Sequence, residues 1–124
     1  ARLLGRDSAA VSGDFVCSVV ECARERRAIV IGKSHTTVIA RPDGRYAIVD
    51  GMNPALGTGG SGDVLTGAVA GLLAGGADPW DAARAAVLAH QDAGRRLRER
   101  TGLFLAEELP AELGRIVDVR PQSR

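Results

Sequence analysis

The chain has 124 residues, enough for one domain with a core, and 45% of them are hydrophobic. Its 16 basic and 15 acidic residues leave a net charge of +1, and aromatic residues make up only 3%. This balance argues against a nucleic-acid or membrane-surface partner, because both need positive charge and base recognition also uses aromatic stacking. The longest uncharged run, Val64 to Ala77, is shorter than the ~20 residues that span a bilayer.

The first half of the sequence predicts a helix, a buried strand and a hairpin. Hydrophobic residues recur at helical spacing between Ser8 and Arg24, and the apolar run 28–31 that follows reads as a buried strand stopping at Gly32. Runs 37–40 and 46–49 flank a Pro-Asp-Gly turn, which predicts a hairpin. Cys17 and Cys22 fit no redox or zinc motif, so we expect reduced, mostly buried thiols and a cytoplasmic location, and no segment resembles a signal peptide.

The second half predicts three helices. The first follows a glycine-rich loop and ends at Gly75-Gly76, with Gly67 and Gly71 allowing close packing against a neighbour. The second begins with Asp78 as N-cap and Pro79 at the first helical position. A final helix covers 103–113, interrupted at Pro110. The expected apolar face of the first helix is Leu65, Val69, Leu72 and Leu73, and that of the second is Trp80, Ala83, Val87, His90, Gly94 and Leu97.

The loop between Asn53 and Asp63 has the composition of an anion-binding site. Its glycines let backbone N–H groups approach a phosphate, and the helix that follows adds unpaired donors and its positive dipole end. Asp63 has two interpretations, because an aspartate here either caps the helix or handles a proton. A carboxylate repels phosphate, and a plain cap needs no glycine-rich loop, so the second interpretation is favoured.

The run NPALGTGGSGDVLTGAVAGLLAGGADPWDAARAAVLAH resembles the C-terminal signature of the ADP- or ATP-dependent NAD(P)H-hydrate dehydratases, of the ribokinase-like superfamily. Residues 1–5, the segment GKSHTTVIARPDG and residues 102–113 resemble further parts of that family. The resemblance implies an α/β, three-layer αβα architecture. Residues 1–124 would then be the C-terminal part of a single nucleotide-binding and catalytic domain, whose N-terminal half is missing.

The family's reaction is the dehydration of (S)-NAD(P)H hydrate to NAD(P)H, through phosphorylation and loss of the ring hydroxyl. The resemblance implies ADP or ATP as co-substrate, with Mg²⁺ arriving on the nucleotide and no protein metal site; a homo-oligomer is left open. Asp63 would be the catalytic and substrate-binding residue. Gly57, Thr58, Gly59, Gly60, Ser61 and Gly62 would form the anion hole, while Gly32, Lys33, Ser34, His35, Thr36 and Gly62 would bind the nucleotide.

Several readings stay open beside these. The family segment usually begins Lys-Gly, whereas here Gly32 precedes Lys33, so Lys33 is either a nucleotide contact or a solvated lysine at a strand edge. We expect His90 and Trp80 to be core residues and the arginines at 95–100 to be solvated. The alternative functions are a ribokinase-like kinase of hydroxymethylpyrimidine or hydroxyethylthiazole, and a non-catalytic nucleotide-binding fragment.

Overall fold

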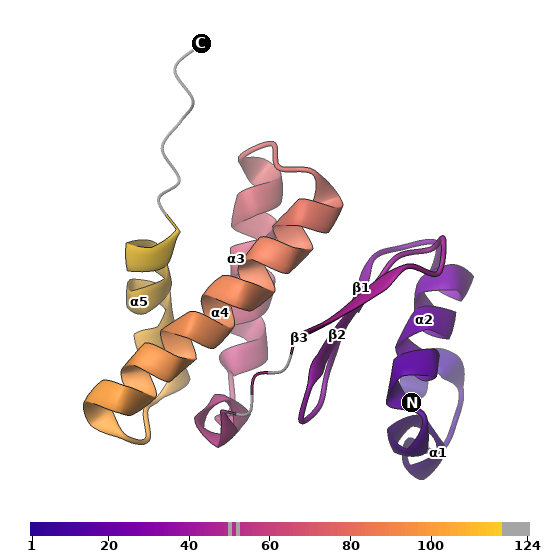
Figure 1. The fold of residues 1–124 in the computed structure, drawn as a ribbon, viewed down its shortest axis with the longest axis horizontal. Coiled ribbons are helices and arrows are strands. Elements are labelled where there is room, and N and C mark those ends of the chain that lie inside the picture. Colours follow the sequence, from indigo (N-terminus) through magenta and orange to yellow (C-terminus); the bar gives the residue numbers. More distant parts are fainter. Residues whose placement is uncertain (50, 52, 118–124) are drawn as a thin grey trace. The chain divides into compact units, whose positions relative to one another are not determined.

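A computed structural model describes residues 1–49, 51 and 53–117, which group into two compact units, Ala1–Asp50 and Gly51–Arg124. The first unit is a helix-and-sheet unit (Figure 1). Its strands pair antiparallel in the order β1-β2-β3. In chain order its elements are the 3₁₀ turn η1 (Arg2–Leu4), α1 (Ser8–Gly13), α2 (Phe15–Arg26), β1 (Val30–Lys33), β2 (Thr37–Ala40) and β3 (Tyr46–Val49).

Helix α2 packs against one face of this sheet. The small core between them consists of Val19, Ala23, Val38 and Ala40, with Phe15, Val16, Val20 and Val30 packed around it. Because side chains alternate along a strand, Val30 and Gly32 of β1 lie on the α2 side and Lys33 lies on the opposite face. Gly32 has no room for a side chain, since a Cβ there would collide with Val19.

The predicted hairpin is confirmed. Ala40 pairs with Tyr46, and the Arg41 N–H donates to the Arg45 carbonyl at 2.8 Å. Asp43 tightens the turn, because its Oδ1 accepts the Arg45 N–H at 3.0 Å. The turn chemistry therefore acts as the Pro-Asp-Gly signal predicts.

The other elements of the first unit differ from the prediction in detail. The single helix over 8–24 is wrong, since Asp14 has φ −135° and ψ 62° and separates α1 from α2. The strand begins and ends two residues later than 28–31, because Arg27 adopts a left-handed conformation and the Ala28 N–H donates to Ala23 O to close α2.

The expectation of buried thiols holds for Cys22 and is wrong for Cys17, which is exposed; both are free. Cys17 lies on the first turn of α2, within reach of Asp14. A hydrogen bond to Asp14 and the negative charge of that carboxylate raise the pKa of the Cys17 thiol. Cys17 is therefore not an activated nucleophile.

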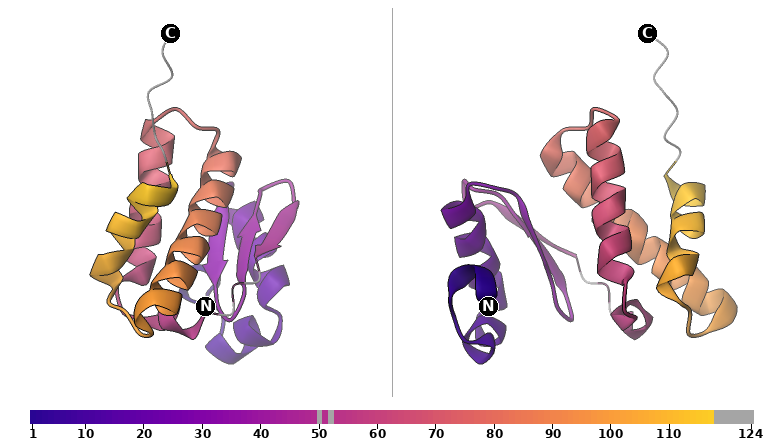
Figure 2. Two further views of the ribbon diagram at one scale, coloured as in Figure 1. Left: turned by 60° about the vertical axis from the view of Figure 1, so that its left-hand side comes forward. Right: turned by 180° about the vertical axis from the view of Figure 1, so that it is seen from behind.

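The second unit is helical in its described part (Figures 1 and 2). It comprises the 3₁₀ turn η2 (Pro54–Gly57), α3 (Ser61–Ala74), α4 (Pro79–Thr101), the 3₁₀ turn η3 (Ala106–Glu108) and α5 (Leu109–Ile116). Helices α3, α4 and α5 contact one another around a core made of Ala55, Leu56, Ala89, Ala93, Leu97, Phe104, Leu109 and Leu113. No helix within 1–49, 51 and 53–117 combines the length and the apolarity needed to cross a bilayer.

The start of α4 is confirmed in atomic detail. Asp78 Oδ1 accepts the Trp80 N–H at 2.9 Å and the Asp81 N–H at 3.3 Å, and Pro79 is the first helical residue. The expected apolar face of α4 is buried from Ala83 to Leu97, whereas Trp80 is only half-buried. The arginines at 95, 96, 98 and 100 are exposed, as expected.

Two expectations for the other helices are wrong. Pro110 does not interrupt a helix but lies in the first turn of α5, where its missing N–H costs nothing. On α3, Leu73 is 42% exposed instead of buried. Among the described residues, no atom of a neighbouring element lies within 4 Å of where a Cβ at Gly67 or Gly71 would be. The small residues of α3 therefore leave room beside the helix.

A buried carboxylate links α4 to α5. Glu112 of α5 is nearly inaccessible, and its Oε2 lies 2.7 Å from Arg115 Nη1 and 3.2 Å from Arg100 Nη2. Burial raises the pKa of the Glu112 carboxyl, but hydrogen bonds from Arg115 and Arg100, together with their charges, outweigh this effect and hold the pKa below its usual value.

We expect Glu112→Gln to lower the melting temperature at neutral pH and to make little difference in acid. A carboxyl whose pKa is lower in the folded chain stabilises the fold above its unfolded-state pKa, and this contribution is lost as the pH falls through the folded-state pKa. Thermal unfolding of both proteins over acidic to neutral pH measures the effect. Glu107→Gln is the control, because Glu107 is exposed and has no ion pair within the described residues. An equal loss at all pH values would contradict the prediction.

Candidate functional site

The glycine-rich loop starts on a capped turn. Asn53 Oδ1 accepts the Ala55 N–H at 3.1 Å and so begins η2, which carries Pro54 in its first turn. Ala55 and Leu56 are buried in the core of the second unit. The chain therefore enters the loop from a fixed point.

Gly60 turns the chain from the loop into α3. It is the N-cap residue of α3 and has φ +91°, a left-handed conformation that side chains rarely adopt. A Cβ at this position would also lie 3.2 Å from the Ala106 Cβ. The conformation therefore favours glycine here, and the short contact with Ala106 leaves little room for a side chain.

The turn presents unpaired donors. Among the described residues, the backbone N–H groups of Gly59, Gly60 and Gly62 have no acceptor, and these three residues are exposed. The Ser61 and Asp63 N–H groups do have acceptors, Thr58 O and Gly60 O, at 3.3 and 3.0 Å. Free N–H groups at a helix N-terminus are suited to an anion.

The side chain of Ser61 is buried and stabilises the turn. Its side chain is 4% exposed, and its hydroxyl donates to the Leu56 carbonyl at 2.7 Å. Ser61 was predicted to belong to the anion hole, but its hydroxyl instead connects the end of the loop to Leu56 at its beginning. Thr58, the other hydroxyl of the loop, is half-buried.

Asp63 is the third residue of α3 and does not cap it, because Gly60 holds the cap position. Its side chain is exposed and makes no hydrogen bond or ion pair within the described residues. The carboxylate is thus available to a ligand at the same helix end as the unpaired glycine N–H groups.

Helix α4 contacts the loop through His90 and Gly94. His90 is 1% exposed and its Nε2 lies 2.9 Å from the Ser61 carbonyl oxygen. One turn further along α4, a Cβ at Gly94 would lie 2.7 Å from Leu56 Cδ2 and 3.0 Å from Asn53 Nδ2, so the loop packs directly on the glycine backbone. His90 and Gly94 therefore hold the two ends of the loop.

The segment Gly32–Thr36 is a separate turn in the first unit. Gly32 and Lys33 end β1, and the Ser34 N–H donates to Thr36 O at 2.9 Å, which leaves Ser34 and His35 exposed at the connection to β2. Lys33 is exposed, yet partial withdrawal of its ammonium from water lowers its pKa.

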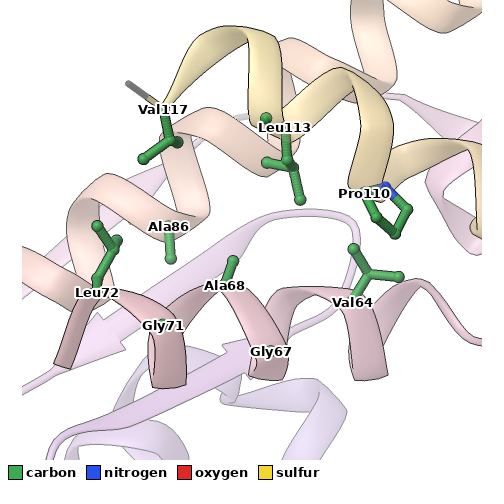
Figure 3. A pocket seen from close by; sticks show the side chains of 10 residues that line it. Val64, Gly67, Ala68, Gly71, Leu72, Ala86, Pro110, Leu113 and Val117 are labelled. Atoms are coloured by element: carbon green, nitrogen blue, oxygen red, sulfur yellow. The ribbon is translucent and has the colours of Figure 1, made fainter. Parts of the chain in front are cut away.

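A hollow of about 360 Å³ lies among α3, α4 and α5. Figure 3 shows Val64 and Ala68 of α3 facing Pro110 and Leu113 of α5 across it. All ten lining residues are apolar or glycine, including Gly67 and Gly71. Within the described residues, no three His, Cys, Asp or Glu side chains gather as metal ligands.

Residues 1–116 match the family model described as NAD(P)H-hydrate dehydratase. The chain belongs to this family. It is 40% identical over 124 residues to the ADP-dependent (S)-NAD(P)H-hydrate dehydratase of Xanthomonas campestris, covering 98% of this chain and 43% of that protein. It is 34% identical over 120 residues to the Bifunctional NAD(P)H-hydrate repair enzyme Nnr of Escherichia coli, covering 95% of this chain and 23% of that protein.

Two solved structures have the same fold. Bacillus subtilis YxkO has a TM-score of 0.84 and 31% identity, over 90% of this chain and 42% of that one. The ADP/ATP-dependent NAD(P)H-hydrate dehydratase from Bacillus subtilis, co-crystallized with ATP/Mg²⁺, has a TM-score of 0.79 and 31% identity, over 86% of this chain and 39% of that one. The α/β, ribokinase-like fold is thereby confirmed for the part covered. The chain spans less than half of the length of these relatives.

Sequence reasoning missed the support of the loop by α4. It assigned both His90 and Gly94 to the buried face, which is confirmed, but gave neither a contact with the loop. One signal could have indicated this contact. His90 and Gly94 lie four residues apart on the apolar face of α4, at positions where larger apolar residues are the usual choice for a core.

Gly94→Ala should lower the free energy of unfolding by roughly 1–2 kcal/mol, because overpacking against Leu56 outweighs the gain in helix propensity. Gly71→Ala is the matched control. It lies in a helix beside open space and should raise stability by up to about 1 kcal/mol. Urea unfolding measures both, and a stabilising Gly94→Ala would show that the approach of the loop is not tight.

Proposed function

We propose that this chain supplies the phosphate-binding and catalytic part of an ADP- or ATP-dependent (S)-NAD(P)H-hydrate dehydratase. The observation that carries the proposal is the first turn of α3, where unpaired N–H groups of three glycines adjoin the exposed Asp63 carboxylate. The family membership supports the same reaction, since this chain is 40% identical over 124 residues to a relative named as an ADP-dependent (S)-NAD(P)H-hydrate dehydratase.

The glycine N–H groups would stabilise the transferring phosphoryl group. In this reaction the hydroxyl oxygen of the hydrated nicotinamide attacks the terminal phosphorus of the nucleotide, and the bond to the leaving nucleotide breaks. Negative charge on the phosphoryl oxygens is spread over a loose transition state. Donors that are already in place, such as those of Gly59, Gly60 and Gly62, lower the energy of that state without reorganising.

Asp63 would orient the attacking hydroxyl and accept its proton. The proton would move late, as phosphoryl transfer proceeds, because the transition state of this transfer is loose. The phosphate ester then leaves with its C–O bond electrons, the ring nitrogen lone pair assists, and loss of a proton from the neighbouring ring carbon restores the dihydropyridine. The hydrated dinucleotide thus loses the elements of water. Its hydroxyl oxygen ends in inorganic phosphate, and the nucleotide has one phosphoryl group fewer.

The nucleotide would also contact the turn Gly32–Thr36. Its exposed Ser34 and His35 and the ammonium of Lys33 can donate hydrogen bonds to a nucleotide. Mg²⁺ would come with the nucleotide, because its octahedral shell is filled mainly by phosphate oxygens and water.

A complete active site would need more chain than these residues. The relatives are more than twice as long, which supports the interpretation of residues 1–124 as the C-terminal part of one ribokinase-like domain whose missing half presents the hydrated dinucleotide. Two free cysteines support a reducing, cytoplasmic location.

The test is recovery of the dihydropyridine absorbance when the full-length protein that carries this chain is incubated with hydrated NADH and ADP or ATP. Recovery with equimolar phosphate release is expected. Phosphorylation of a hydroxymethylpyrimidine or hydroxyethylthiazole without recovery would instead assign a small-molecule kinase. Nucleotide binding in calorimetry without any turnover would indicate a non-catalytic fragment.

Asp63→Asn in the same protein should lower kcat by roughly 10²–10⁴-fold while leaving nucleotide affinity nearly unchanged. The reason is that Asp63 would contact the acceptor hydroxyl, whereas the glycine N–H groups hold the phosphate. Asp81→Asn is the matched control, because Asp81 is the third residue of α4 as Asp63 is of α3. An equal loss of turnover and nucleotide affinity in Asp63→Asn would mean that Asp63 is structural.

A further inference from the structure

We propose that His90 is a positioning residue for the first turn of α3. Through its bond to the Ser61 carbonyl it would fix where the Gly62 N–H and the Asp63 carboxylate lie relative to a bound phosphate. The catalytic consequence rests on the proposed function; the effect on the turn does not.

The contact defines the role of the histidine. A carbonyl oxygen only accepts, so His90 Nε2, 2.9 Å from Ser61 O, carries the proton and donates it. Since this nitrogen is engaged and the side chain is 1% exposed, His90 cannot use it to reach a substrate. A direct role as base is thereby excluded for Nε2.

The bond is additional to what the helix itself needs. Ser61 is the first residue of α3, and its carbonyl already has the Leu65 N–H as its regular helical donor. A second donor from a buried side chain 29 positions away therefore does not repair an unsatisfied group. It joins the first turn of α3 to the middle of α4.

The same turn of α4 controls both ends of the loop. His90 holds Ser61, Gly94 receives Leu56, and the Ser61 hydroxyl donates to the Leu56 carbonyl at 2.7 Å. Residues four apart on a helix lie one above the other at a fixed spacing. The distance between the loop ends is thus set by one rigid turn of α4.

Asp63 depends on this support because its own side chain has no partner among the described residues. The position of its carboxylate follows from the backbone of residues 61–63. A misplacement of about 1 Å in a catalytic group costs on the order of 10²-fold in rate. A loosened first turn should therefore reduce turnover more than it reduces binding.

The test compares His90→Gln, His90→Leu and Ile116→Val in the full-length protein. The Gln amide nitrogen lies close to where Nε2 lies and can donate the same bond, whereas Leu is of similar size and cannot. Ile116→Val trims the periphery of the same core at the end of α5 and serves as the control for general destabilisation.

His90→Leu should lower kcat about 10–100-fold with little change in KM for the nucleotide, and speed amide exchange at Ser61 and residues 63–65 roughly tenfold. His90→Gln should restore most of both, and Ile116→Val should change neither beyond its effect on melting temperature. Unchanged exchange in His90→Leu, or changes no larger than in Ile116→Val, would overturn the proposal. Amide exchange does not depend on turnover. An inactive wild-type protein would therefore refute the proposed function, whereas the exchange rates of the three variants would still test the role of His90.

Discussion

The close approach of the loop to α4 is the constraint on which the candidate site depends. Leu56 packs where Gly94 has no side chain, and the Ser61 carbonyl meets the His90 imidazole one turn away. These contacts fix the beginning and the end of the loop. The glycines between Leu56 and Ser61 therefore need no further contacts to hold the loop in place. Their exposed N–H groups can then stay free for an anion, since the fold of the loop does not use them.

Features encoded by neighbouring residues were predictable from the sequence. The Asp78-Pro79 start of α4 and the Pro-Asp-Gly hairpin each depend on bonds within a few residues. The same reasoning erred at Pro110, because a proline ends one helix or begins another, and only the neighbouring η3 turn decides between them.

Features that join distant residues were not predictable from one sequence. His90 and Ser61 are 29 residues apart, and neither periodicity nor composition pairs them. The role of a glycine is also hard to predict from the sequence. Its lack of a side chain allows close contact with a neighbour at one position and leaves a hollow at another. Gly94 meets Leu56 directly, whereas Gly67 and Gly71 border the apolar hollow. The surroundings of each glycine, which a sequence does not state, decide its use.

The loop contacts described above lie within the second unit, and they involve Asn53, Leu56, His90, Gly94 and Ala106. A turn built this way is preformed by its own helices, so an anion bound by its N–H groups would pay little for ordering the loop. The proposed catalysis would need more, because Asp63 would act only on a hydroxyl held in line with the phosphorus. Under the proposed function, phosphate binding would need only the first turn of α3 and its supports, whereas turnover would also need the surface that holds the acceptor hydroxyl.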